Sequence, residues 1–329
     1  MIRALAALRR PASFLLVPLS VVPLIAVIPI LSDSKQSFER THESAPLPAL
    51  QVRFSPQQQR RFQPMPALHG AVPVLAYHGI NGNRDRYSVS RAAFAAHMAL
   101  LKRLGFQTIS ITDYARFYRG EPVDLPPRPI LVTFDDGRLD SYRGADEVLA
   151  RDGFQATMFV ITGEIERGNP FYLTWRELHR MADSGRWQIQ PHAHNGHRRI
   201  SATADGRTGP YYAVRWYTRS DGEESVADYE RRVSRDVYEA VDTLEHQGFP
   251  PVAFSVPFGD DGHSRESDPH AAPFLDALLR RQFEVTFVQH PDNDPSFTRP
   301  HARAERYEVR TGTTTDQLYD WLHTQQRRH

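Results

Sequence analysis

The chain has 329 residues, and its 40 lysine and arginine residues against 39 aspartate and glutamate residues give a formal net charge of +1. This balance argues against a nucleic-acid-binding protein that relies on bulk positive charge. Cysteine is absent, which excludes disulfide scaffolds, thiolate zinc sites and cysteine nucleophiles, and the 40% hydrophobic content is that of an ordinary globular protein.

The N-terminal sequence predicts a membrane anchor. Several arginines precede an almost purely apolar run over residues 14–31. The run is near the lower limit for a helix that spans a bilayer, which needs about 20 residues, and it lacks the small-residue pattern of a cleavage site. We therefore assign residues 1–32 to an uncleaved signal anchor and expect the rest of the chain to be exported. Prolines within the run leave cleavage, and so a secreted product, open.

The remainder of the chain divides into a tether and one domain. Residues 33–70 are polar and irregular, which predicts a flexible tether, and residues 71–329 suit a single barrel-sized domain. In chain order, the first half of the domain is predicted to contain a strand over 72–77, a helix between its cap Ser90 and Gly105, a strand over 106–110, a Pro-rich connection, a strand over 130–134, a helix over 140–151 and a strand over 156–162. A helix with a capping box at Thr174 and Glu177, a strand over 187–190, a helix over 226–247 and a strand over 252–256 follow. The last predicted elements are a helix near 273–281, strands over 285–288 and near 307–309, and a helix capped by Thr314.

Strands that alternate with helices predict parallel strands covered by helices. The fold class is therefore α/β, and the expected architecture is a (β/α) barrel. In such a barrel the chemistry lies at the C-terminal ends of the strands. Polar clusters follow several of the predicted strands at this point.

Two adjacent carboxylates, Asp135 and Asp136, follow the strand over 130–134. Removing an ionised carboxylate from water at the end of an apolar strand costs free energy unless a positive charge lies beside it. Consecutive strand residues point to opposite faces, and Gly137 permits a turn that could bring both carboxylates to one site. The alternative is an ordinary loop in which Asp136 and Gly137 supply only the turn.

Three histidines, His192, His194 and His197, follow the strand over 187–190. Neutral imidazole is a common zinc ligand. His192 and His194 share a face if the strand continues, whereas His192 and His197 meet if the chain turns after His194. Two imidazoles and one carboxylate of the Asp pair would leave a position open for water, which is typical of catalytic rather than structural metal sites. Surface histidines that bind no metal are the alternative.

Two more strand ends carry candidate residues. The segment Phe254–Gly259, with Pro257 and Phe258, supplies an apolar wall and backbone N–H groups that could face a developing oxyanion. His78 follows the strand over 72–77 and would lie at the same end of the barrel.

Together these residues resemble the polysaccharide deacetylase family, which is carbohydrate esterase family 4 with the NodB homology domain. The resemblance runs from about residue 72 to residue 309 and rests on three segments: Thr133–Gly137, His192–His197 and Ser255–Gly259. It implies a distorted (β/α) barrel of the polysaccharide deacetylase type, a divalent metal ion, usually Zn²⁺, and hydrolysis of acetyl groups on sugars. By its position in the motif, Asp135 resembles the general base of the family. The metal ligands of the family correspond to Asp136, His192 and His197.

Within the family, the segment Tyr77–Ile80, the lead-in Leu173–Trp175 and the spacing of the two histidine ligands resemble the subgroup that deacetylates poly-N-acetylglucosamine. In that subgroup the barrel motifs are circularly permuted. The resemblance implies that His78 is the general acid. We further predict that Phe258, Pro257, Trp175 and His194 bind the substrate, although His194 could instead be a spare metal ligand or have neither role.

One departure from the family concerns the base. Ser255 stands where ordinary members have an arginine that holds the base aspartate. The partner of Asp135 is therefore left unidentified by the sequence.

The function that the resemblance implies is a metal-dependent polysaccharide N-deacetylase. Its partners would be the acetylated polysaccharide, the membrane through the N-terminal segment, and a polysaccharide synthase, with no nucleic acid. Three alternatives stay open: an esterase on O-acetylated glycans, a peptidoglycan deacetylase, and a catalytically silent carbohydrate-binding barrel.

Overall fold

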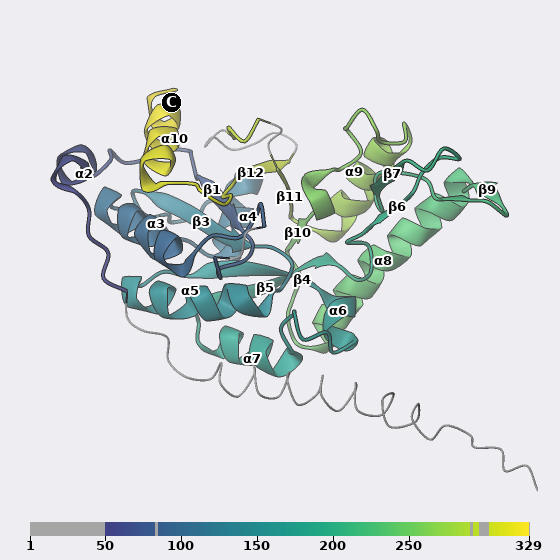
Figure 1. Cartoon of the computed structure of the whole chain (residues 1–329), viewed down its shortest axis with the longest axis horizontal. Coiled ribbons are helices and arrows are strands. Elements are labelled where there is room, and N and C mark those ends of the chain that lie inside the picture. The colour runs from purple at the N-terminus through teal and green to yellow at the C-terminus, as the bar shows by residue number, and fades with distance from the viewer. Residues whose placement is uncertain (1–49, 83–84, 290–291, 296–302, 329) are drawn as a thin grey trace, which may run out of the picture. The chain divides into compact units, whose positions relative to one another are not determined.

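The computed structural model describes residues 50–82, 85–289, 292–295 and 303–328 (Figure 1). The predicted signal anchor, residues 1–32, lies outside the described residues. Within these described ranges, no helix is both long enough and apolar enough to cross a membrane.

The domain is built on one parallel sheet of eight strands that almost closes into a barrel (Figure 1). Seven strands follow one another in the order β10-β11-β12-β1-β3-β4-β5, and β2 pairs with the start of β3. The strands are β1 Val74–Tyr77, β2 Gln107–Thr108, β3 Pro129–Phe134, β4 Ala156–Ile161, β5 Trp187–Ala193, β10 Ala253–Ser255, β11 Val285–Gln289 and β12 Ala304–Glu308. The first strand, β1, lies between β3 and the last strand, β12. The predicted parallel α/β barrel is confirmed.

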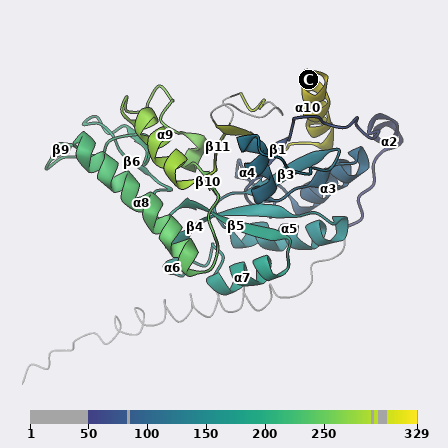
Figure 2. The same ribbon diagram turned by 180° about the vertical axis from the view of Figure 1, so that it is seen from behind.

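Helices cover the outside of the sheet, with α3 and α5 toward one side and α8 and α9 toward the other (Figure 2). The helices are α2 Pro56–Arg61, α3 Arg91–Leu104, α4 Ile111–Arg119, α5 Leu139–Asp152, α6 Thr162–Glu166, α7 Trp175–Asp183, α8 Val226–His246, α9 Ala271–Gln282 and α10 Thr315–Arg328. The predicted caps are confirmed, since the Ser90 hydroxyl accepts the Ala93 N–H and Thr174 forms a reciprocal capping box with Glu177.

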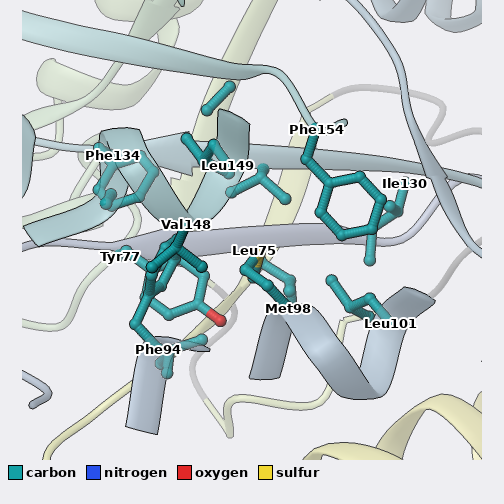
Figure 3. Packing of buried hydrophobic residues seen from close by; sticks show 14 of the residues in the cluster. Leu75, Tyr77, Phe94, Met98, Leu101, Ile130, Phe134, Val148, Leu149 and Phe154 are labelled. Carbon is teal, nitrogen blue, oxygen red and sulfur yellow. The ribbon is translucent and has the colours of Figure 1, made fainter. Parts of the chain in front are cut away.

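A large hydrophobic core lies between the sheet, α3 and α5. Phe94, Met98 and Leu101 form an apolar stripe on α3 and pack toward Leu75 of β1 and Val148 of α5 (Figure 3). Burial of this stripe, rather than helix propensity, provides most of the stability of such a helix.

The Pro-rich connection predicted after residues 106–110 contains an additional helix. The strand there is only β2, and Ser110 caps α4 through a hydrogen bond from the Asp113 N–H. Tyr114 of α4 is buried in one cluster with Val74, Ala253 and other residues at the starts of the strands. α4 therefore fills the end of the barrel opposite to the polar clusters.

The flexible tether predicted for residues 33–70 is wrong for residues 50–70. Ser55 caps α2, and Phe62 and Met65 are buried in the core beside α3. The compact unit begins at Leu50, and residues 33–49 lie outside the described residues. Isolated apolar residues in a polar segment have no periodicity, so only their tertiary partners reveal that they are buried.

Hydrogen bonds from side chains bridge the gap between the two outer strands, β5 and β10. The Gln190 Oε1 atom on β5 accepts the N–H groups of Val252 and Ala253 at 2.8 Å each. His192 Nδ1 donates to the carbonyl oxygen of Ser255 at 2.7 Å. Buried backbone groups at a sheet edge need partners, and these side chains supply them.

Candidate metal centre and catalytic site

The candidate residues lie at the C-terminal ends of the strands, as predicted. His78 directly follows β1, Asp135 directly follows β3, and His192 is the second-last residue of β5. Asp135 lies close enough to both His78 and His192 for their charges to act on it. Residues more than 100 positions apart are thus brought to one site.

A tight turn separates the roles of the two adjacent carboxylates. Asp136 and Gly137 both adopt left-handed backbone conformations, with φ of 77° and 74°. Aspartate tolerates this region better than most residues, whereas at Gly137 a Cβ atom would also lie 3.0 Å from the Val160 side chain. The predicted turn is confirmed, and it directs Asp135 and Asp136 to different partners.

Asp136, His192 and His197 converge on one point. The Asp136 Oδ1 atom lies 3.7 Å from His192 Nε2 and 3.4 Å from His197 Nε2, and the three candidate donor atoms lie within 4.8 Å of one another. Ligand atoms of a tetrahedral zinc ion are about 3.3 Å apart, given bond lengths near 2.0–2.2 Å. Asp136 Oδ1 is buried and has no hydrogen-bond partner among the residues that the structure describes. This donor set therefore fits a divalent cation.

His192 is prepared for metal binding by its surroundings. Because its Nδ1 atom donates to the Ser255 carbonyl oxygen, its Nε2 atom keeps a free lone pair on the side of Asp136. Burial lowers the pKa of His192 to about 4, so the imidazole is neutral at pH 7. The neutral form is the one that binds metal ions.

The third histidine does not join this group. β5 ends at Ala193, and the chain then turns, so His192 meets His197 and not His194. His194 Nδ1 lies 2.9 Å from the Thr162 hydroxyl. The alternative in which His192 and His194 share the metal is wrong, and a substrate contact for His194 stays a prediction.

The partner of Asp135 is Arg306 on β12, which the sequence analysis missed. The Arg306 guanidinium donates to both carboxylate oxygens of Asp135, at 2.8 and 2.7 Å, and both side chains are buried. It also donates to the Ser255 hydroxyl at 2.8 Å, which in turn donates to Asp135 at 3.1 Å. The small Ser255 side chain leaves room for an arginine from a different strand.

This ion pair keeps Asp135 charged. Burial alone would raise the pKa of the Asp135 carboxyl, but the Arg306 guanidinium and, next, His192 outweigh burial and hold that pKa below its ordinary value. Asp135 is therefore an ionised carboxylate throughout the neutral range, beside the metal-binding group.

The sequence did contain a signal for Arg306. The strand predicted near 307–309 in fact begins at Ala304, and its burial alternates so that Ala304, Arg306 and Glu308 are buried. An arginine in the inward register of a barrel strand needs a buried anion.

Comparison with known proteins agrees with this geometry. Residues 123–267 match the family model described as polysaccharide deacetylase. Over these residues the chain is similar to the polysaccharide deacetylase family. A poly-beta-1,6-N-acetyl-D-glucosamine N-deacetylase of Escherichia coli is 24% identical over 274 residues, which cover 77% of this chain and 38% of that protein. The chain thus spans well under half the length of the curated relatives it matches.

Solved structures of two proteins share the deacetylase fold. A de-N-acetylase from Aggregatibacter actinomycetemcomitans matches with a TM-score of 0.65 at 19% identity, over 76% of this chain and 99% of that chain. The BpsB deacetylase domain from Bordetella bronchiseptica matches with a TM-score of 0.62 at 24% identity, over 75% of this chain and 99% of that chain. These similarities agree with the nearly closed parallel barrel of this chain.

Exposed aromatic rings lie around the candidate site. The Phe258 ring, 45% exposed, stacks on His197 with centroids 4.6 Å apart. The Tyr87 ring lies 5.1 Å from the His78 ring, and the Phe171 ring lies 4.7 Å from the Arg138 guanidinium. The charge of Arg138 in turn interacts with Asp136.

The other predicted substrate residues occupy different surroundings. Pro257 begins the 3-10 turn Pro257–Gly259 and is buried, and Phe258 in this turn has a left-handed φ of 61°. Trp175 begins α7 and packs against the hydrophobic core, so its substrate contact stays a prediction. Tyr172 was not predicted, yet it lies near Asp136: burial and then the Asp136 charge raise the pKa of Tyr172 to about 12.

We predict that Arg306→Gln destabilises the metal-free protein by about 3–5 kcal/mol at pH 7, because it leaves the Asp135 carboxylate buried without its cation. In the wild type the folded pKa of Asp135 is lowered, so its contribution is present above the unfolded value near 4 and is lost as pH falls. In the variant burial raises that pKa. The difference in free energy of unfolding between the wild type and Arg306→Gln should therefore become smaller as the pH is lowered from 7 to 5, as measured by urea unfolding.

The control is Arg61→Gln, which removes a guanidinium paired with Asp316 and Asp320 at the surface. This control should cost about 1 kcal/mol or less, with little change between pH 7 and pH 5. A stability difference for Arg306→Gln that stays constant over this range would contradict the assignment of Arg306 as the partner of Asp135.

Proposed function

We propose that this protein is a metal-dependent hydrolase that removes acetyl groups from N-acetylglucosamine-containing polysaccharide, with a poly-N-acetylglucosamine exopolysaccharide as the favoured substrate. The observation that carries this proposal is the convergence of Asp136, His192 and His197 beside the ionised Asp135. The similarity to the poly-beta-1,6-N-acetyl-D-glucosamine N-deacetylase of Escherichia coli supports this class of substrate.

The metal-binding residues would be Asp136, His192 and His197. A divalent cation held there, with Zn²⁺ the first candidate, would supply a water of lowered pKa and polarise the acetyl carbonyl group. The two imidazoles and one carboxylate leave a coordination position for water, which is the pattern of catalytic sites.

The remaining residues would move protons and stabilise charge. Asp135 would accept the proton of the attacking water, since each carboxylate oxygen can accept a further hydrogen bond beside those from Arg306. His78 would protonate the departing amine as the C–N bond breaks, which yields acetate and a free amino group on the sugar. The backbone N–H of Phe258 would stabilise the oxyanion of the tetrahedral intermediate.

We expect Asp135→Asn to lower acetate release from β-1,6-linked N-acetylglucosamine oligomers by about 100-fold or more while bound metal is retained. His197→Ala should lose both activity and metal, and chelation of the wild type should abolish an activity that added Zn²⁺ restores. Acetate release and metal content are measured in parallel.

A wild-type protein that binds metal but releases no acetate would contradict hydrolysis and favour a silent carbohydrate-binding barrel. Faster release from an O-acetylated glycan, or from peptidoglycan, than from these oligomers would contradict the favoured substrate. The same panel of substrates therefore separates the alternatives.

The exposed rings around the site would bind sugar units next to the acetylated one. Apolar faces of sugars pack well on aromatic rings, and three exposed rings, Tyr87, Phe171 and Phe258, contact groups of the site. Such contacts hold a chain in the site without taking part in the reaction.

We predict that Phe171→Ala raises KM for the oligomers about 2- to 10-fold with little change in kcat, because a ring contact contributes about 0.5–1.5 kcal/mol. The matched control is Tyr238→Ala. This substitution removes a ring of similar exposure from the face of α8 that points away from the buried residues of this helix. Equal effects of the two substitutions on KM would contradict a sugar-binding role for Phe171.

We also propose that residues 1–32 hold the protein in the cell membrane with the catalytic domain exported, where it would meet polysaccharide delivered by a synthase. The apolar run and the preceding arginines support this placement. The full-length protein should stay in the membrane fraction at its full mass of 37.6 kDa. Recovery of a shortened, soluble form outside the cell would contradict the anchor and favour cleavage.

A further inference from the structure

One buried carboxylate from a distant helix holds the loop that joins the two histidine ligands. Asp236 lies in α8 and is 3% exposed. Its Oδ1 atom accepts the N–H groups of His194 and Gly196 at 3.1 Å each, and its Oδ2 atom accepts the N–H of Asn195 at 2.6 Å. Three consecutive backbone donors between His192 and His197 therefore converge on one side chain.

A fourth hydrogen bond ties this carboxylate to the segment that follows the loop. The Tyr212 hydroxyl donates to Asp236 Oδ1 at 2.5 Å. Burial and then the Asp236 charge raise the pKa of Tyr212 well above its ordinary value, so the hydroxyl keeps its proton and remains a donor. Tyr212 is itself held, because the Tyr229 hydroxyl of α8 donates to its carbonyl oxygen at 2.6 Å.

The loop is packed closely against Asp236 and Tyr212 on one side and α6 on the other. A Cβ atom at Gly196 would lie 2.6 Å from the Tyr212 ring and 2.8 Å from Asp236 Oδ1. On the other side, the Gly163 N–H of α6 donates to the His194 carbonyl oxygen at 3.0 Å. The loop is thus clamped between α6 and α8.

The two histidine ligands differ in how they are held. The Nδ1 atom of His192 is fixed by its bond to the Ser255 carbonyl oxygen. The described contacts of the His197 ring are with the His192 and Phe258 rings and with Asp136. The position of His197 therefore depends on the backbone that carries it, which is the backbone that Asp236 binds.

We propose that Asp236 is the positioning residue of the metal centre. It sets the backbone of residues 194–196 so that His192 and His197 present their Nε2 atoms to the same point as Asp136. The inference rests on the proposed function only in that a divalent metal binds there. Outer partners of metal ligands typically change metal affinity by about 10- to 100-fold when they are removed.

The test is Asp236→Asn, which keeps the shape of the side chain but turns an NH₂ group toward backbone N–H donors. We expect Zn²⁺ affinity to fall 10- to 100-fold, as measured by competition with a chromogenic chelator on the metal-free full-length protein. Acetate release at limiting Zn²⁺ should fall in parallel and should recover in part when Zn²⁺ is raised.

The matched control is Glu224→Gln, which changes a partly buried carboxylate beside α8. Glu224 accepts hydrogen bonds from the Trp216 N–H and the Arg232 guanidinium, so it binds a neighbouring segment to α8 and makes no hydrogen bond to residues 194–196. The Zn²⁺ affinity of the Glu224→Gln variant should stay within about twofold of the wild-type value. An equal loss in both variants would overturn the positioning role and indicate general loosening.

A folded Asp236→Asn protein with wild-type Zn²⁺ affinity would also overturn the inference. If this variant does not fold, Gly196→Ala gives a second test. The added Cβ atom would displace Asp236 and Tyr212, so Zn²⁺ binding should weaken about tenfold. Unchanged Zn²⁺ binding by Gly196→Ala would overturn the inference as well. Failure of the wild type to bind Zn²⁺ would instead contradict the proposed function, so the two failures are distinguishable.

Discussion

The buried ion pair between Arg306 and Asp135 is the interaction on which the site depends. Removing two charges from water costs several kcal/mol, which only close geometry and further hydrogen bonds offset. Here the guanidinium binds both carboxylate oxygens, and Ser255 binds both partners. Arg306 belongs to β12 and Asp135 follows β3, and β1 lies between these strands. The pair forms only when the barrel is assembled, so folding and assembly of the site are coupled.

The incomplete closure of the barrel supplies a second constraint. At the gap between β5 and β10 the strands do not pair, and Gln190 and His192 bind the backbone in place of a neighbouring strand. For His192 this structural bond also fixes which ring nitrogen is free for a metal. On the far side of the same loop Asp236 binds the backbone, so the two ligands of one loop are held by two separate parts of the fold.

Much of the fold could be predicted because its signals are local. The cap at Ser90, the capping box of Thr174 and Glu177, and the turn at Gly137 each depend on residues within a few positions, and all three predictions are confirmed. The helix α4 was missed because a short amphipathic segment beside prolines resembles a loop, and residues 50–70 were missed because their buried side chains, Phe62 and Met65, follow no periodic pattern.

The sequence by itself determined the donor types and the places where they follow strands: a pair of carboxylates, three imidazoles and the α/β alternation that brings strand ends together. The family resemblance already indicated His197 as the second imidazole ligand, but only the tertiary structure decided which residue neutralises Asp135 and what holds the loop between the ligands. The reason is physical: a side chain's charge state and direction depend on partners across the barrel, and Arg306 lies 171 residues from the carboxylate that it binds. Local patterns carry no information on such contacts.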